Sequence, residues 1–295
     1  MKRKIKIGFG ERIFDVVNVL ITSSLTLIIL IPLLSILFAS LSDPVEVMRH
    51  QGLFLFPKGI NFGAYIAVSK NPSIISGYLN TIFIVVVGTS INIVLTLIGA
   101  YVLSRKNTLL VRPITLMIVF TMYFQGGTIP FYLVVRNVGL DNSIWALIFP
   151  VAISTFNLII MRTAMVGVPE SLPESAMIDG AGHVRILFQI MMPLVQATVA
   201  VLLLYYAVAH WNAWFNAMIF LRNRRLYPLQ LILREIIIHN NAQMMMGNVT
   251  VDEQGFIGET IRYATIVVAT IPILCIYPFL QRYFVKGVMI GALKG

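Results

Sequence analysis

The residues whose types and spacing suggest chemistry lie in one short stretch, residues 168–193. It begins V-P-E-S-L-P-E-S-A-M-I-D-G-A-G-H and then turns apolar. Two of its acids, Glu174 and Asp179, are separated by small and apolar residues, and Gly180 follows directly. Neither an H-E-x-x-H metal motif nor a G-x-x-x-x-G-K-[ST] phosphate loop occurs anywhere in the chain. The pattern therefore favours a contact with a partner over catalysis or ATP binding by this chain.

This stretch predicts two short helices that meet at a sharp corner. Ser171 and Glu174 fit an S-x-x-E capping box, which starts a helix. Gly180 suits the end of that helix because glycine reaches positive φ without strain. A second helix is expected to begin near His183 and to end at Pro193. Such a shape can dock in a groove on a partner protein and transmit a movement of that partner to the rest of the chain.

The composition indicates which kind of protein positions this corner. The chain has 295 residues, of which 58% are hydrophobic and only 12% are charged. A soluble domain of this length does not need so much apolar surface, so the expected solvent is lipid. The formal net charge of +10 then reflects basic loops on the cytoplasmic side of a membrane, and the hydrophobicity argues against a nucleic-acid partner. The single cysteine, Cys275, excludes an intrachain disulfide.

Six long segments lack Asp, Glu, Lys and Arg. A membrane span needs about 20 residues at a rise of about 1.5 Å each, and unbroken runs of this length favour helices over barrel strands. One segment is too long for a single span, and Pro193 divides it into a lead-in, Ile186–Met192, and a span, Pro193–Ala213. The six segments are Val19–Leu41, Leu79–Leu103, Pro113–Val135, Ile144–Met161, Ile186–Leu221 and Tyr263–Gln281.

The basic residues predict the orientation of these spans. Residues 1–12 carry five basic residues and one acid, and Ser104–Arg112 carries Arg105, Lys106 and Arg112 with no acid. Because positive charge is retained inside, both segments and both termini are expected to be cytoplasmic. The predicted organisation is a cytoplasmic N-terminus (1–12), a first span (13–41), an outer loop (42–77), a core of five spans (78–281) and a cytoplasmic tail (282–295).

The stretch around Glu174 resembles the EAA loop of the permease subunits of binding-protein-dependent ABC importers. That loop reads roughly E-A-A-x-x-D-G-A, followed by an apolar and aromatic segment and then L-P. Here the chain reads E-S-A-M-I-D-G-A from Glu174 to Ala181, with Phe188 and Met192-Pro193 further on. Ser175 stands for the first Ala and Met192 for Leu, and both changes are small in volume.

The resemblance extends over nearly the whole chain. Asn80-Thr81, Ile129–Leu140 and Trp211–Phe215 are similar to the family's second span, third span and fifth-span exit. The tail Lys286–Gly295 resembles the G-A-x-K-G ending of the sugar-importing branch. The chain is most similar to the maltose-type permease subunit without a large extra outer domain, and within that branch to the group associated with complex oligosaccharides.

The resemblance implies an all-α membrane protein with six transmembrane helices, in the MetI-like, type I importer fold with cytoplasmic coupling helices. It implies a bacterial plasma-membrane transport subunit and not an enzyme, with no cofactor on this chain because ATP and Mg²⁺ bind to partner subunits. The implied partners are two ATPase subunits, a second permease subunit (a different chain rather than a second copy), an extracellular solute-binding protein and a carbohydrate. Lys286 and Lys294 in the tail are candidates for an ATPase contact. The residues implied to couple to the ATPase are Glu174, Ser175, Ala176, Asp179, Gly180, Ala181 and Pro193.

Polar and aromatic residues within the expected spans are candidates for a translocation path. Two further interpretations stay open: intramembrane amides form hydrogen bonds between helices, and Trp and Tyr gather at membrane interfaces. His210 lies among apolar residues and is interpreted as a packing residue rather than a metal ligand, and no metal site is expected. The path candidates are Asn80, Asn157, Tyr205, Trp211, Asn212 and Trp214.

The basic cluster Arg222, Arg224 and Arg225 is expected on the outer side. It fits a solvated loop or a lipid contact, an acidic face of the binding protein, or an anionic sugar such as a uronate oligosaccharide. The main alternative function for the whole chain is a stand-alone secondary transporter or channel. Such proteins place ionisable residues inside their spans, and the six apolar segments contain no Asp, Glu, Lys or Arg.

Overall fold

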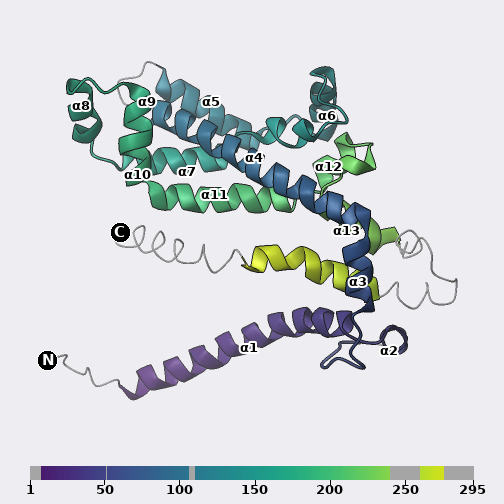
Figure 1. Cartoon of the computed structure of the whole chain (residues 1–295). Coiled ribbons are helices and arrows are strands. Elements are labelled where there is room, and N and C mark those ends of the chain that lie inside the picture. Colours follow the sequence, from purple (N-terminus) through teal and green to yellow (C-terminus); the bar gives the residue numbers. More distant parts are fainter. Residues whose placement is uncertain (1–7, 51, 106–109, 240–259, 276–295) are drawn as a thin grey trace. The chain divides into compact units, whose positions relative to one another are not determined.

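The computed structural model of the protein describes residues 8–50, 52–105, 110–239 and 260–275. Within these ranges the regular elements are all helices, in keeping with the expected all-α class. The chain divides into two compact units, Met1–Asn71 with Ile236–Ala269, and Pro72–Glu235 with Thr270–Gly295. Figure 1 labels the helices along the chain.

The first unit is built on one long apolar helix, α1 (Phe9–Ser40). Most of its side chains are exposed, as expected for a helix whose surface faces lipid rather than a protein core. Two short helices follow, α2 (Pro44–Arg49) and α3 (Gly63–Lys70). The apolar helix Thr260–Cys275 begins in the same unit.

Serine side chains fasten the segment after α1 to the end of that helix. The Oγ of Ser35 accepts a hydrogen bond from the Phe54 N–H at 2.8 Å, and the Oγ of Ser42 accepts one from the Lys58 N–H at 3.0 Å. Ala39 and Phe54 pack together in a small buried cluster. The segment predicted as an outer loop therefore contains two short helices and is held against the end of α1.

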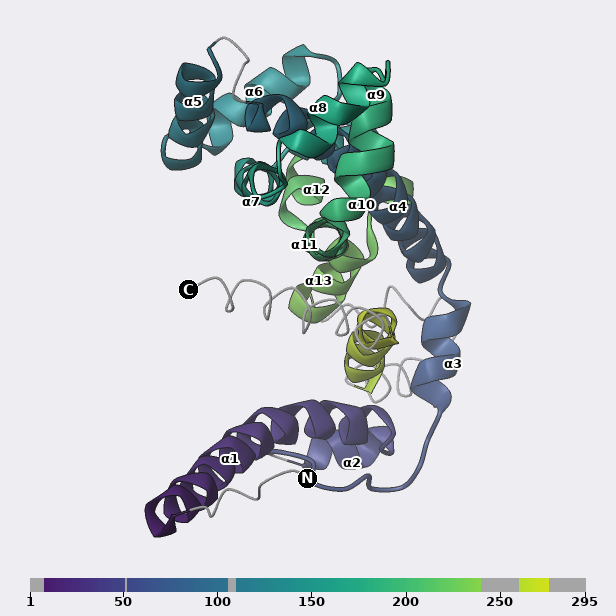
Figure 2. The same ribbon diagram turned by 90° about the vertical axis from the view of Figure 1, so that its left-hand side faces the viewer.

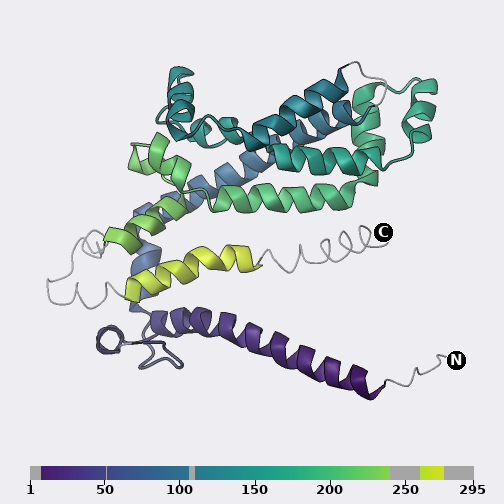
Figure 3. The same cartoon turned by 180° about the vertical axis from the view of Figure 1, so that it is seen from behind.

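The second unit contains three helices that lie side by side, α4 (Pro72–Ser104), α7 (Thr155–Val166) and α11 (Gln196–Trp211) (Figures 1 and 3). Their apolar faces meet in the largest buried cluster of the described chain, where Ala100, Met161 and Leu202 are fully buried. Figure 2 looks toward one end of α7 and α11. The remaining elements outside residues 168–194 are α5 (Val111–Tyr123), α6 (Thr128–Asn137), η1 (Ile144–Leu147), η2 (Phe149–Val151), α12 (Phe215–Phe220), η4 (Arg224–Leu226) and α13 (Leu229–His239).

A buried polar layer crosses the three packed helices. The Asn92 side-chain amide donates to the carbonyl oxygens of Val151 and Ala152, both at 2.8 Å, and its Oδ1 lies 2.7 Å from the Nε2 of His210. Those two carbonyls lie at the break between η2 and α7, where no helical N–H is available to them. The layer therefore pairs backbone groups that would otherwise be orphaned in an apolar interior. The packing role expected for His210 is confirmed.

The described residues contain two helices long enough to cross a membrane alone, α1 and α4. They correspond to the first two predicted spans, although α4 begins at Pro72, within the segment expected as an outer loop. The prediction of an unbroken third span over Pro113–Val135 is wrong, because α5 and α6 meet at 116°. Gly127 lies between them with φ +83°, a conformation that an L side chain rarely adopts.

Two further spans are also bent. The fourth divides into Ile144–Val151 and Thr155–Val166 at 46°, and the fifth into His183–Leu194 and Gln196–Trp211 at 90°. The division predicted at Pro193 is therefore confirmed to within two residues. The sixth expected span begins in the helix Thr260–Cys275.

Replacing Asn92 is predicted to destabilise the second unit. In Asn92→Leu the carbonyls of Val151 and Ala152 and the ring of His210 lose their partner, at a cost of about 2–4 kcal/mol. We expect the melting temperature in detergent to fall by roughly 5 °C or more. The control is Ser90→Ala on the same helix, because Ser90 is exposed and bonds only the Val86 carbonyl one turn back. Equal melting temperatures for the two variants would contradict a structural role for the layer.

Candidate functional site

The first helix of the 168–193 stretch is α8 (Ser171–Ile178). The predicted capping box is wrong, because the residue at the cap position is Glu170 and no side chain caps the helix. Ser171 already has helical backbone geometry, and its carbonyl accepts a hydrogen bond from the Oγ of Ser175 at 2.7 Å. Glu174 is therefore free of a capping role, and its carboxylate forms no ion pair with any described residue.

The predicted glycine corner is present and is closed by two backbone hydrogen bonds. Gly180 has φ +80°. The Ala181 N–H donates to the Ala176 carbonyl at 2.9 Å and the Gly180 N–H to the Met177 carbonyl at 3.0 Å. This pair of bonds is the Schellman motif, which satisfies the last carbonyls of a helix and turns the chain away from its axis.

The second helix runs over residues 183–194 and has a wide middle turn. It consists of α9 (His183–Arg185), the π-helical segment η3 (Ile186–Met191) and α10 (Met192–Leu194). Pro193 has no N–H to donate and crowds the preceding turn, and a π-helical turn relieves that conflict. After this proline the chain turns by 90° into α11.

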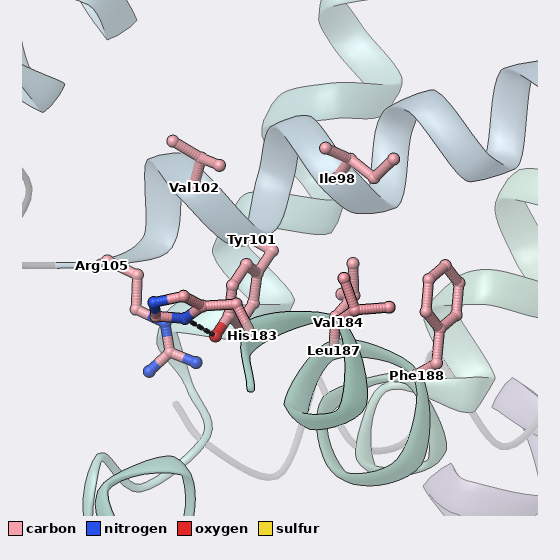
Figure 4. Close-up of a pocket in the computed structure, with 8 residues that line it drawn as sticks. All are labelled: Ile98, Tyr101, Val102, Arg105, His183, Val184, Leu187 and Phe188. Atoms are coloured by element: carbon pink, nitrogen blue, oxygen red, sulfur yellow. Dashed lines mark hydrogen bonds between the residues drawn. The ribbon is translucent and has the colours of Figure 1, made fainter. Parts of the chain in front are cut away.

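The second helix is packed into the same buried cluster as α4, α7 and α11. Ile186, Leu187 and Met191 are buried in that cluster, and the π-helical segment that carries them contacts α4 and α8. At its first residue the His183 Nδ1 lies 3.0 Å from the hydroxyl of Tyr101, near the end of α4 (Figure 4). The corner is therefore attached at one side to the packed helices, so a displacement of α8 would be carried into them.

The opposite side of the corner is open. Glu174, Ser175, Asp179, Gly180 and Pro193 are exposed, while Ala176 and Ala181 are half-buried against the main cluster. All seven predicted coupling residues thus lie on α8, the corner or the end of the second helix.

Apolar side chains on α8 are exposed beside the two acids, a feature that the sequence pattern alone did not predict. Ile178 is 87% exposed, and Leu172 and Met177 are exposed as well. Exposed apolar side chains around a few charges are typical of a protein-binding surface. Their exposure could have been predicted, because the sequence places them on a short helix outside the membrane spans.

The predicted path residues do not form one cluster with a shared role. The Asn80 amide donates to the carbonyls of Arg225 at 2.7 Å and Tyr227 at 3.1 Å, and the Asn212 amide donates to the Val208 carbonyl at 2.9 Å. The first contact is the interhelical bonding that was left open as an alternative. Asn157 is buried at the start of α7.

The aromatic candidates lie on α11 and just after it. Trp211 is buried with its ring 6.3 Å from that of Tyr78, Tyr205 is exposed, and the ring of Trp214 is covered by the guanidinium of Arg234 at 4.4 Å. A role of these six residues in a translocation path stays a prediction.

The basic cluster is partly neutralised. Arg222 pairs with Asp141 at 3.0 Å, and Arg224 pairs with Glu235 at 3.3 Å. The side chain of Arg225 has no ion-pair partner in the described part of the chain. Lys286 and Lys294 lie outside the described residues. Among the residues that were described, no group of His, Cys, Asp and Glu is arranged to hold a metal ion.

Comparisons with known proteins identify relatives along the full length of the chain. It is 38% identical to Protein LplC of Bacillus subtilis over 288 residues, covering 96% of each chain. It is 37% identical to the polygalacturonan/rhamnogalacturonan transport system permease protein YtcP of the same organism, covering 97% of this chain and 99% of that one. No family model matches the chain.

Among solved structures, the chain is similar to one from a bacterial ABC transporter involved in the import of the acidic polysaccharide alginate. The TM-score is 0.85 at 32% sequence identity, over 94% of this chain and 98% of the other. The same fold therefore extends over nearly the whole length of both chains.

Proposed function

The chain belongs to the permease subunits of bacterial ABC importers for sugars and oligosaccharides, and from that premise we propose that its 168–193 loop is the coupling site for the ATPase. The chain is a plasma-membrane transport subunit and not an enzyme, since ATP hydrolysis in these importers is carried by a separate chain. This assignment sets aside the alternative of a stand-alone secondary transporter or channel.

The observation that carries the proposal is the two-sided geometry of the glycine corner. One side presents Glu174, Asp179 and Ile178 to the surroundings, and the other is buried with the packed helices α4, α7 and α11. In the proposed mechanism α8 sits in a groove on a cytoplasmic ATPase subunit. Closure of two ATPase subunits on ATP moves α8, and the buried second helix transmits that motion to the spans. The binding energy of ATP is thereby converted into alternating access.

We propose a six-span topology with both termini in the cytoplasm. The spans are α1, α4, the bent pair α5–α6, the bent pair η1–α7, α11 and the segment that begins with Thr260–Cys275. The excess of Lys and Arg in residues 1–12 and Ser104–Arg112 supports this orientation, because short basic loops remain inside.

The proposed assembly contains two permease subunits, two ATPase subunits and an extracellular solute-binding protein. The second permease is expected to be a different chain. ATP and Mg²⁺ are held by the ATPase subunits, and this chain binds no cofactor. The tail residues Lys286 and Lys294 are proposed to reach the ATPase from the cytoplasmic side.

We further propose that the cargo is an acidic oligosaccharide. Two relatives are named for acidic polymers, alginate in one and polygalacturonan in the other. In this chain Arg225 lies next to the paired Arg222 and Arg224, so the cluster retains a net positive charge on the side proposed to face the binding protein. A positive surface attracts a uronate chain, and its effect falls as salt rises.

Gly180→Val is predicted to stop transport without removing the protein from the membrane. A β-branched residue at φ +80° is strained by about 1–2 kcal/mol or more, which opens the corner. We expect uptake by the whole importer to fall about tenfold or further. The matched control is Gly182→Val, because Gly182 has φ −72° and ψ 161°, a region that valine favours. Normal uptake in Gly180→Val would contradict the coupling role of the loop.

The cargo is tested by competition for uptake. Labelled oligogalacturonate should enter cells that express the importer with its binding protein, and unlabelled oligogalacturonate should compete while a malto-oligosaccharide of equal length should not. Arg225→Gln should reduce oligogalacturonate uptake more at low salt than at high salt. Uptake of a labelled malto-oligosaccharide by the same cells, with no uptake of labelled oligogalacturonate, would assign the importer to a neutral oligosaccharide.

A further inference from the structure

A pocket of about 390 Å³ lies between the end of α4 and the first turns of the second helix (Figure 4). Its α4 wall is made by Ile98, Tyr101, Val102 and Arg105, and the facing wall begins at His183. The coupling contacts described above include the Tyr101–His183 pair at one end of this pocket, and they leave its exposed apolar walls and Arg105 without a role.

Arg105 brings a positive charge into the pocket, and no described residue forms an ion pair with it. Its guanidinium lies over the Tyr101 ring, 4.3 Å from the centroid. The Nε and one terminal nitrogen of Arg105 are buried and have no hydrogen-bond partner among the described residues. The ring attracts the cation but offers no acceptor for the N–H groups. The other terminal nitrogen has no partner among the described residues either, and it is not buried. A guanidinium stays charged at all physiological pH values, so this nitrogen is the group that an anion entering the pocket would meet.

The rest of the pocket is apolar and opens to the outside of the unit. Ile98 and Val102 are exposed on α4, and Val184 and Phe188 are exposed on the second helix. Ile98, Val102 and Arg105 follow an i, i+4, i+7 stripe, so the apolar part extends about 10 Å along α4 from the charge. On a membrane span, exposed apolar side chains of this kind contact lipid chains.

We propose that this pocket binds an anionic phospholipid, with its phosphate on the Arg105 guanidinium and its acyl chain along Ile98 and Val102. Arginine donates to phosphate oxygens in a fork, and basic pockets at the cytoplasmic ends of spans suit anionic headgroups. A carboxylate from a partner protein would satisfy the charge but not the apolar stripe that continues into the membrane. The proposal rests on the topology proposed above, which places Arg105 in the inner leaflet.

The bound lipid would rest on the helix that carries the coupling corner. The pocket wall includes His183, whose ring bonds Tyr101, and Phe188 one turn further along the same helix. Occupancy of the pocket therefore supports the face of the second helix that α4 does not cover. This gives the lipid a place next to the coupling loop rather than at a remote surface.

The test is native mass spectrometry of the complete importer purified in mild detergent. With added phosphatidylglycerol, the wild-type complex should retain the lipid, and phosphatidylcholine should be retained about tenfold less. Arg105→Gln should lower phosphatidylglycerol retention about tenfold. Arg112→Gln is the matched control, because it removes the same charge from the first turn of α5, outside the pocket.

A second variant distinguishes loss of the lipid site from misfolding of Arg105→Gln. Val184 is 72% exposed, so Val184→Glu should leave the complex intact while it repels the phosphate and lowers phosphatidylglycerol retention. Unchanged retention in both pocket variants, or equal retention of the two lipids by the wild type, would overturn the proposal. Loss of ATPase subunits from Arg105→Gln with phosphatidylglycerol still bound would show that Arg105 contacts a protein instead. Loss of ATPase subunits from the wild type would count against the proposed function and not against the lipid pocket.

Discussion

The packing of the second helix of the loop into the buried cluster shared by α4, α7 and α11 is the interaction on which the proposed mechanism depends. Ile186, Leu187 and Met191 belong to the same buried cluster as Ala100 and Met161. Because well-packed interiors have few voids and low compressibility, a force applied at α8 is passed on rather than absorbed. The Schellman turn at Gly180 adds a defined angle between the exposed helix and the buried one. A loop that merely lay on the surface could dock but would not move the spans.

The same unit must also satisfy its backbone polar groups in an apolar setting. Breaks in spans leave N–H and C=O groups without helical partners, and the structure pairs those near α7 through two side chains. Asn92 binds the carbonyls of Val151 and Ala152, and the Tyr206 hydroxyl accepts a hydrogen bond from the Ser154 N–H at 3.2 Å. These contacts join α4 and α11 to the start of α7. The broken span is therefore held in one position relative to its neighbours.

Much of the arrangement followed from residue types and spacing. Gly180 was predicted to end a short helix because few other residues accept positive φ, and the lead-in before Pro193 followed from the loss of an N–H. The prediction of an unbroken third span was wrong because it was based only on the absence of charged residues. The signal against it was local: Gln125 and two glycines interrupt the apolar run at the point where α5 ends.

Other features depend on contacts between residues far apart in the sequence. The pairing of Tyr101 with His183 and of Asn92 with His210 cannot be read from a single chain, because it requires the helices to be placed first. The prediction of a capping box was wrong because the helix starts at Ser171 itself, one residue earlier than a Ser171 cap would require. A Ser-x-x-Glu pattern also fits the first turn of such a helix. The six-span count and both terminal orientations stay predictions. The family itself is confirmed by relatives along the full chain.

The most direct test of the coupling site is site-specific photocrosslinking in native membranes. A photoreactive amino acid replaces Ile178, which is 87% exposed on α8, or Ile60, which is 73% exposed in the segment proposed to face outward. The account predicts an adduct with an ATPase subunit from position 178 and none from position 60. An ATPase adduct from position 60, or lipid adducts alone from position 178, would contradict the claim that α8 docks on the ATPase.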